Sequence, residues 1–261
     1  MFDPIQAAEE IKNSYIDYIT TTFDMSDETY KQELRKKLTE NGMIASGPYL
    51  DIGGSYETGH TIRELVESRL VSPLFEKLEP IAEEKRELKL ERALYCHQET
   101  ALLKANAGEN LVITTGTGSG KTESFLLPII NHLLCQQEAG TLDAGVRAII
   151  IYPMNALAND QMKRMRALFR NYPQICYGVY NGNTEHAQSK ALEEYRKTFR
   201  DEQGNPLEPM ENEIISREVM QKTPPHILIT NYSMLEYMML RPKDDQVFSG
   251  AKLKFIVLDE A

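Results

Sequence analysis

The segment Thr114-Thr115-Gly116-Thr117-Gly118-Ser119-Gly120-Lys121-Thr122 constrains this sequence more than any other. It follows an apolar run, Leu111 to Ile113, and precedes a stretch with helical apolar spacing, Glu123 to Leu134. A glycine-rich turn between a strand and a helix directs backbone N–H groups and the positive end of the helix dipole at one anion. Lys121 is placed to reach the β- and γ-phosphates of a nucleotide, and the Thr122 hydroxyl to hold Mg²⁺. A linker of small residues would not explain the Lys-Thr pair or the flanking pattern.

The loop and the start of the helix supply the predicted nucleotide-binding residues. They are Thr117, Gly118, Ser119, Gly120, Lys121, Thr122 and Glu123. Thr115 stands six residues before Lys121, where such loops usually have Gly or Ala. Its small hydroxyl side chain is expected to fit the same space.

Composition and length exclude several classes of protein. With 261 residues, the chain is long enough for one large domain or two small ones. No apolar run approaches the roughly 18 residues that span a bilayer, and the amino terminus has no signal-peptide pattern. The three cysteines are odd in number and lack Cys-x-x-Cys spacing, so neither a disulfide framework nor a zinc site is predicted. We expect a cytoplasmic protein with no membrane partner and with reduced, mostly buried thiols.

The charge balance limits how the chain can contact nucleic acid. Its formal net charge is -10, and the acidic surplus lies mainly in the first 90 residues. This argues against a protein that coats nucleic acid through bulk positive charge. Local contacts with phosphates through loops and helix amino termini stay open.

The pattern of apolar residues changes near residue 90. Residues 1–90 are predicted to form an all-helical accessory region, and residues 91–261 an α/β domain whose parallel sheet has helices on both faces. The predicted strands are Leu111–Thr115, Ala148–Tyr152, Cys176–Tyr180, Ile227–Thr230 and Phe255–Leu258. The predicted helices are Glu123–Leu134, Ala156–Phe169, Glu185–Phe199 and Met234–Leu240, and capping boxes are Thr61 with Glu64 and Ser233 with Glu236. The polar stretch Asp201–Glu213 is expected to be a mobile excursion.

Two carboxylates follow the last apolar run, Phe255 to Leu258. Asp259, at the carboxyl end of a strand, can hold the Mg²⁺ that Thr122 also contacts, and Glu260 can orient the attacking water. A carboxylate pair after a strand is otherwise often a helix cap, but together with the phosphate loop it favours nucleotide hydrolysis. We predict Lys121, Asp259 and Glu260 as catalytic residues, and Thr122 and Asp259 as metal ligands.

With the phosphate loop and the carboxylate pair that follows the last apolar run, residues Leu94–Ala261 resemble the first RecA-like domain of superfamily 2 DEAD/DEAH-box helicases. Asp259-Glu260-Ala261 matches the first three letters of the box that names them. The resemblance implies a P-loop RecA-like sheet, incomplete where the chain stops at the Walker B motif, with ATP and Mg²⁺ as ligands. It also implies that Gln98 reads the adenine edge, since an amide can donate to N7 and accept from the N6 amine. The alternative for Gln98 is an ordinary glutamine on a helix surface.

Three segments after predicted strands resemble family segments that hold a single nucleic-acid strand. They begin at Tyr152, Tyr180 and Thr230, and Asn183 stands where relatives often have aspartate. Carboxyl ends of strands are where open α/β sheets bind ligands, and short polar groups with backbone donors suit phosphates. The resemblance assigns the nucleic-acid backbone to Pro153, Asn155, Gly182, Thr184, Thr230 and Asn231. Helix capping is the alternative role for such residues.

The segment Ile229 to Tyr237, followed by Leu240-Arg241-Pro242, is similar to a bacterial group of large helicases related to the MrfA repair helicase. Some members of that group serve in antiphage defence. The similarity implies a DNA substrate more than RNA, and 3′ to 5′ polarity.

Helicases of this kind hydrolyse ATP between two RecA-like domains, the second of which supplies arginine fingers. Because the chain stops inside the Asp-Glu-Ala box, we expect it alone to bind nucleotide weakly at most, without ATPase or unwinding. Its expected partners are nucleic acid and a second RecA-like domain, or a subunit that supplies one. The leading hypothesis is the amino-terminal part of an ATP-dependent DNA helicase or translocase. The alternatives are a non-catalytic truncated or split-subunit binding module, and a P-loop ATPase that acts without nucleic acid.

Overall fold

The computed structural model describes residues 3–23, 26–40, 42–47, 49, 55–78, 89–116, 118–153, 155–201 and 203–259. These residues form two compact units, residues 1–55 and residues 56–261. The division falls earlier than the boundary near residue 90 that the apolar pattern predicts. Each unit is described by itself.

The first unit is a pair of helices, α1 (Pro4–Thr22) and α2 (Glu28–Thr39). Both begin at an aspartate cap: the Asp3 side chain accepts from two backbone N–H groups, and the Asp27 side chain accepts from the N–H of Thr29. Arg35 of α2 forms an ion pair with Asp17 of α1, with 2.6 Å between nitrogen and oxygen.

The second unit is built on a five-stranded parallel sheet with the strand order β5-β4-β6-β3-β7. The strands are β3 (Ala148–Tyr152), β4 (Tyr177–Val179), β5 (Glu213–Ile214), β6 (Ile227–Asn231) and β7 (Phe255–Leu258). Every residue of β3 is buried, as expected for a central strand covered on both faces. The predicted α/β fold is therefore confirmed.

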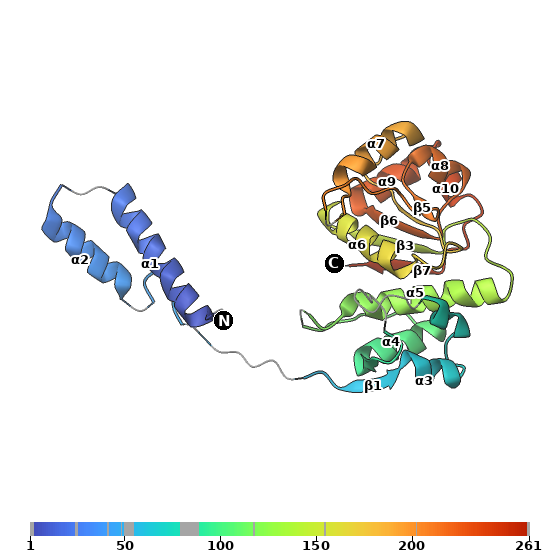
Figure 1. The fold of residues 1–261 in the computed structure, drawn as a ribbon, viewed down its shortest axis with the longest axis horizontal. Coiled ribbons are helices and arrows are strands. Elements are labelled where there is room, and N and C mark those ends of the chain that lie inside the picture. Colours follow the sequence, from blue (N-terminus) through green and yellow to red (C-terminus); the bar gives the residue numbers. More distant parts are fainter. Residues whose placement is uncertain are drawn as a thin grey trace. The chain divides into compact units, whose positions relative to one another are not determined.

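Helices cover both faces of this sheet (Figure 1). Successive residues of β3 point to opposite faces, so Ile150 joins one apolar cluster with α5 and α6, and Ile151 joins the other with residues of α8, α9 and α10. The helices are α4 (Cys96–Asn106), α5 (Lys121–Glu138), α6 (Asn155–Leu168), α7 (Gln188–Thr198), α8 (Arg217–Lys222), α9 (Tyr232–Leu240) and α10 (Asp245–Phe248).

A small substructure precedes the sheet in the same unit. The strands β1 (Thr58–Thr61) and β2 (Ala93–Tyr95) pair in antiparallel fashion, and α3 (Ile62–Glu67) and the 3-10 helix η1 (Pro73–Leu78) lie between them in sequence. The capping box of Thr61 with Glu64 is confirmed. β1 is the exception to the expectation that residues 1–90 are all helical. Because Ser72 donates its backbone N–H to the Asn131 side chain of α5 at 2.8 Å and η1 packs on the same helix, this region belongs to the second unit.

The predicted strand Leu111–Thr115 is not formed, since residues 111–116 pair with no strand in the described part of the chain. The Val112 side chain is 92% exposed, and among the described residues β7, the last strand of the sheet, pairs with β3 alone. An apolar run before a glycine loop predicts a strand, but a strand also needs a hydrogen-bonding neighbour.

The polar stretch Asp201–Glu213, predicted as a mobile excursion, is bonded to two helices at its end. Arg166 of α6 donates to Glu213 Oε2 at 2.8 Å and to the Glu208 carbonyl at 2.6 Å, and it also contacts the Tyr195 hydroxyl. Tyr195 in turn donates to Glu213 Oε1 at 2.7 Å. A buried arginine–carboxylate–tyrosine group therefore fixes the end of the excursion to two helices.

No helix in the described residues is both long and apolar enough to cross a membrane. Cys135 is exposed, whereas Cys96 and Cys176 have intermediate exposure. The expectation that the thiols are mostly buried is therefore wrong.

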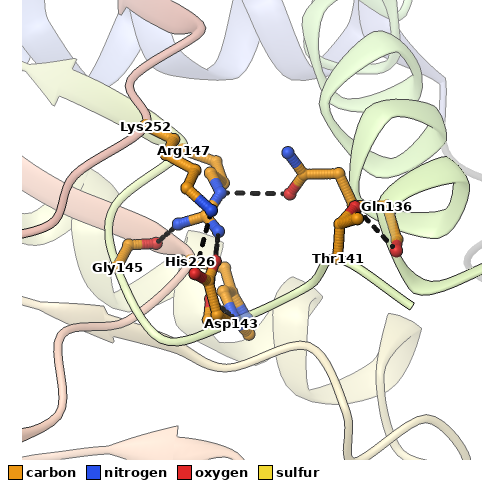
Figure 2. A network of polar contacts seen from close by, with 7 residues as sticks. All are labelled: Gln136, Thr141, Asp143, Gly145, Arg147, His226 and Lys252. Carbon is orange, nitrogen blue, oxygen red and sulfur yellow. Dashed lines mark hydrogen bonds and ion pairs between the residues drawn. The ribbon is translucent and has the colours of Figure 1, made fainter. Parts of the chain in front are cut away.

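A polar network centred on Arg147 sets the direction of α5 against the sheet (Figure 2). Arg147, directly before β3, is fully buried and donates to Gln136 Oε1 of α5 at 3.0 Å and to the Gly145 carbonyl at 2.6 Å. Its guanidinium also pairs with Asp143, which contacts Lys252 at 2.9 Å. Hydrogen bonds from Lys252 and Arg147 hold the pKa of the Asp143 carboxyl at about 2. The network fixes the carboxyl end of α5 to the amino ends of the strands.

Candidate active site

The amino end of α5 has backbone N–H groups that can bind an anion. Its capping residue is Gly120, with φ 72°, and no side-chain hydrogen bond to the cap is seen among the described residues. Gly118 also has a positive φ, 76°, a conformation that glycine adopts without strain. The first backbone N–H groups of α5 therefore keep their donors for a ligand, and Lys121 at this end is exposed.

Two glycines of the loop lie close to side chains of neighbouring elements. A Cβ at Gly116 would lie 2.7 Å from the Tyr56 hydroxyl, and a Cβ at Gly120 would lie 2.4 Å from Gln98 Nε2. Tyr56 itself packs against Tyr95 and His97, with ring centroids 5.3 and 5.6 Å apart. The loop thus lies on a platform of side chains from the β1–β2 substructure and α4. The glycine cradle leaves the backbone donors at the amino end of α5 without a side-chain cap among the described residues, which suits a bound phosphate.

Hydrogen bonds within the platform stabilise the loop. Thr115 Oγ1 and Ser119 Oγ share a hydrogen bond of 2.6 Å, and Ser119 is fully buried. His97 Nε2 lies 3.0 Å from the Ser119 carbonyl oxygen and donates to it. The hydroxyl at Thr115 therefore has a specific partner within the loop.

The Gln98 side chain, which extends from α4, contacts the backbone of the loop. Its Nε2 donates to the Gly120 carbonyl at 3.0 Å, while its Oε1 accepts from the Tyr95 backbone N–H at 2.9 Å. The side chain is 1% exposed. In this arrangement the amide supports the loop directly, and reading of the adenine edge by Gln98 stays a prediction.

The phosphate loop and the strand ends share one edge of the sheet. His132 packs edge to face on Phe255, the first residue of β7, with centroids 5.6 Å apart. From His132 back to Lys121, α5 covers about 16 Å at about 1.5 Å per residue. The strand from Phe255 to Leu258 covers only about 10 Å. Gln136, near the carboxyl end of α5, bonds to Arg147 directly before β3, and α5 runs opposite to β7 (Figure 1), so the amino end of α5 lies toward the carboxyl ends of the strands.

Asp259 lies at this same edge. Its backbone N–H donates to the Ile151 carbonyl at 3.1 Å, so the β3–β7 pairing continues to the carboxylate. Thr122, its predicted partner for Mg²⁺, is the second residue of α5 and has intermediate exposure. The magnesium site of Thr122 and Asp259 stays a prediction. Glu260 and Thr117 lie outside the described residues.

The other predicted contacts also follow strands at this edge, although the structure uses several of them internally. Thr230 is 1% exposed and donates to the Tyr180 carbonyl at 2.7 Å, so its hydroxyl ties the end of β6 to the segment after β4. Thr184 donates to the Val179 carbonyl at 2.8 Å. Thr230 and Thr184 therefore shape the edge, and neither offers an unused hydroxyl proton.

The remaining residues at the edge include exposed positions. Pro153 and Gly182 are exposed, and α6 begins at Asn155. Asn231 caps α9, since its side chain accepts from the Met234 N–H at 2.7 Å. The predicted capping box of Ser233 with Glu236 is therefore wrong, because the helix begins at Tyr232, before that serine.

Sequence reasoning missed three supporting residues, Tyr56, His97 and Arg164. Tyr56 precedes β1 and reaches the loop through a strand pairing that has no local pattern. His97 directly precedes Gln98, a predicted site residue, and this neighbouring position could have indicated that His97 also lies near the loop. Arg164 of α6 contacts Glu123 of α5 at 2.5 Å, which only the packing of two helices reveals.

The sequence profile of the DEAD/DEAH box helicases matches residues 95–261, which contain the phosphate loop, the sheet and Asp259. The chain belongs to this family. The matched region is more than half of the chain, and it begins just before Gln98 and the helix that carries it.

The chain is also similar to individual helicases. It is 31% identical to the Druantia protein DruE of Escherichia coli (strain UMEA 4076-1), over 94% of this chain and 18% of DruE. It is 28% identical to ATP-dependent helicase Lhr-Core protein 2 of Thermococcus barophilus, over 62% of this chain and 17% of that protein. This chain thus spans less than a fifth of the length of these two relatives.

A solved structure, the DUF1998 helicase MrfA bound to DNA and AMPPNP, is similar to this chain at 22% identity and a TM-score of 0.47. The similarity covers 78% of this chain and 22% of MrfA.

Proposed function

We propose that this family member forms the ATP-binding part of an ATP-dependent DNA helicase or translocase. The observation that carries the proposal is the shared edge, at which the open amino end of α5, Asp259 and the loops after β3, β4 and β6 lie together. Open α/β sheets bind ligands at this edge. The proposed partners are a nucleic-acid strand and a second RecA-like domain, within the same protein or on another subunit.

The residues at the edge fit ATP with Mg²⁺. The backbone N–H groups from Gly118 to Thr122 would hold the phosphates, with Lys121 adding positive charge. Thr122 and Asp259 would hold Mg²⁺, and Glu260 would orient water. Bound ATP with Mg²⁺ supplies the phosphoryl bond whose hydrolysis drives movement along a strand.

The nucleic-acid strand is proposed to cross the loops after β3, β4 and β6. Pro153 and Gly182 are exposed there, and the amino end of α6 offers backbone donors at Asn155. Thr184, Thr230 and Asn231 would act mainly by shaping these loops. The similarity of the segment from Ile229 to Tyr237 to MrfA-related helicases supports DNA over RNA. A role in DNA repair or phage defence is proposed on that similarity alone.

The test is a nucleic-acid-dependent ATPase assay on the full-length protein, with single-stranded DNA, duplex DNA and RNA compared. Single-stranded DNA is expected to stimulate turnover most. Lys121→Ala should lower nucleotide binding or turnover by about 100-fold or more, since it removes charge stabilisation at the phosphates. Lys104→Ala, an exposed lysine on α4, is the matched control and should keep wild-type values.

Two results would contradict the proposal. Turnover that is equal with and without DNA or RNA would favour a P-loop ATPase that acts without nucleic acid. Nucleic-acid binding without any nucleotide binding would favour the non-catalytic module.

A further inference from the structure

Glu123 links the phosphate loop to a second helix. It is the third residue of α5, where a carboxylate also interacts favourably with the helix dipole. Its Oε1 accepts a hydrogen bond from Arg164 Nη2 of α6 at 2.5 Å, and each side chain is 21% exposed. This contact is charge-assisted and partly shielded from solvent, so it is stronger than an ion pair at an open surface.

The other carboxylate oxygen of Glu123 faces the loop. Oε2 is buried and has no hydrogen-bond partner among the described residues. A Cβ at Gly120 would lie 2.9 Å from this oxygen. The Glu123 carboxylate therefore lies between the loop backbone at Gly120 and the guanidinium of Arg164. A shift of the loop on binding phosphates would displace the carboxylate and the arginine together.

Arg164 belongs to the helix whose amino end lies at the proposed nucleic-acid edge. α6 begins at Asn155, immediately after the loop that follows β3. Met162, Met165 and Leu168 of the same helix are buried in the apolar core, so α6 is expected to move as one body. The pair thus connects the helix that begins the nucleotide site to the helix that begins at the nucleic-acid loop.

We infer that Glu123 and Arg164 are a positioning pair that couples nucleotide binding to nucleic-acid binding. The inference rests on the proposed function and deepens it. It also assigns Glu123 a role different from the direct nucleotide contact that its place in the sequence predicts. Neither residue needs to touch a ligand, because the coupling passes through one direct contact between two helices.

The test measures the affinity of the full-length protein for a fluorescent ATP analogue with Mg²⁺, with and without saturating single-stranded DNA. The ratio of the two dissociation constants is the coupling factor. We expect a wild-type factor of about 5 or more. In Glu123→Gln and Arg164→Gln it should fall to within about twofold of 1, and the double variant should match the singles.

Two further variants separate coupling from general damage. Lys163→Gln changes the neighbouring exposed residue of α6, which pairs with Asp160 on the same helix, and should keep the wild-type factor. Arg164→Lys keeps the charge and should restore part of the coupling. Loss of both affinities in Arg164→Gln with an unchanged coupling factor would show a merely structural role and would overturn the inference.

A second readout does not depend on DNA. Hydrogen exchange in α6 should slow when the Mg²⁺-bound ATP analogue binds to wild type, and the change should be absent in Arg164→Gln. If wild type binds nucleotide but neither DNA nor RNA, the proposed function fails, and exchange in α6 still decides the coupling between the helices. If DNA binds but α6 does not respond to nucleotide, the inference fails while the proposed function stands. Absence of nucleotide binding by wild type overturns both.

Discussion

Gln98 donates from Nε2 to the Gly120 carbonyl at 3.0 Å, and this single amide joins α4 to the residue that caps α5. Gln98→Glu replaces the donor with a carboxylate that faces a carbonyl oxygen in a buried site. We expect a loss of about 1–3 kcal/mol in the free energy of unfolding, together with weaker nucleotide binding. Chemical denaturation and nucleotide titration measure the two effects. The exposed Gln174→Glu is the control, and equal behaviour of the two variants would remove Gln98 from loop support.

Arg147 should be a major determinant of stability, since its guanidinium is fully buried and bonded to three partners. Arg147→Met leaves Gln136 and the Gly145 carbonyl without this donor. We expect a loss of about 3 kcal/mol in urea denaturation. Lys252→Ala removes only the exposed partner of Asp143 and should cost less than about 1 kcal/mol. A similar loss in both variants would contradict the central role of Arg147.

Two histidines should give the stability opposite pH dependences. Burial lowers the pKa of His226, and the nearby Arg147 charge lowers it further, against the Asp143 carbonyl that raises it. The unfolded chain then binds the proton first, so this contribution is present above about pH 6.5 and is lost as the pH falls. Hydrogen bonding to Glu99 raises the pKa of His60, so that contribution is present below about pH 6.5 and is lost as the pH rises through the raised value.

Thermal midpoints between pH 5 and 8 test these signs. His226→Gln should weaken the loss of stability toward pH 5, because the residue that resists protonation is gone. His60→Gln should make the acid loss steeper, because it removes the contribution that favours acid. A change in the same direction for both variants would contradict the assigned pKa shifts.

The excursion before β5 should depend on Arg166. In Arg166→Met the buried Glu213 carboxylate loses its charged donor, and we expect about 3 kcal/mol of destabilisation. Limited proteolysis should then cut within residues 199–213 faster than in wild type. Arg196→Met, which removes an exposed pair with Glu208, is the matched control. Equal cleavage of the two variants would show that the buried group does not hold the excursion.

The proposed role of Glu260 in orienting water can be tested with a variant that separates nucleotide binding from hydrolysis. Glu260→Gln in the full-length protein should preserve nucleotide binding and block hydrolysis, because a neutral amide still fits the site but cannot accept the proton of the attacking water. Asp259→Asn should instead weaken the Mg²⁺-dependent part of binding. Turnover equal to wild type for Glu260→Gln would exclude it from the water-orienting role.

The central strands and the loop were predictable because their signals are local. Ala148–Tyr152 and Phe255–Leu258 are short apolar runs between polar residues, and both match the observed strands in full. The glycines of the loop stand directly before α5 and Lys121 is its first residue, so the motif alone locates the amino end of that helix. The position of Asp259 at the carboxyl end of a strand was predictable because it directly follows such an apolar run.

The remaining features depend on contacts between distant residues. Nothing in the sequence distinguishes Arg147, which is fully buried, from a solvated arginine before a strand. Glu213 was placed in a polar loop, although it contacts Arg166 and Tyr195 from two helices. The inward orientation of Gln98 depends on the β1–β2 pairing and on α4, and neither has a pattern that specifies its partner.

The outer edge of β7 has a practical consequence for work with this chain. Ile256 and Leu258 are 62% and 63% exposed, and in the described residues the strand pairs on one side only. An apolar strand with unsatisfied backbone groups is a template for pairing with another chain. Concentrated preparations should therefore self-associate through this edge, and Ile256→Lys should raise the concentration at which they stay monomeric. Binding constants measured above that concentration would report a mixture of assemblies in place of the single domain.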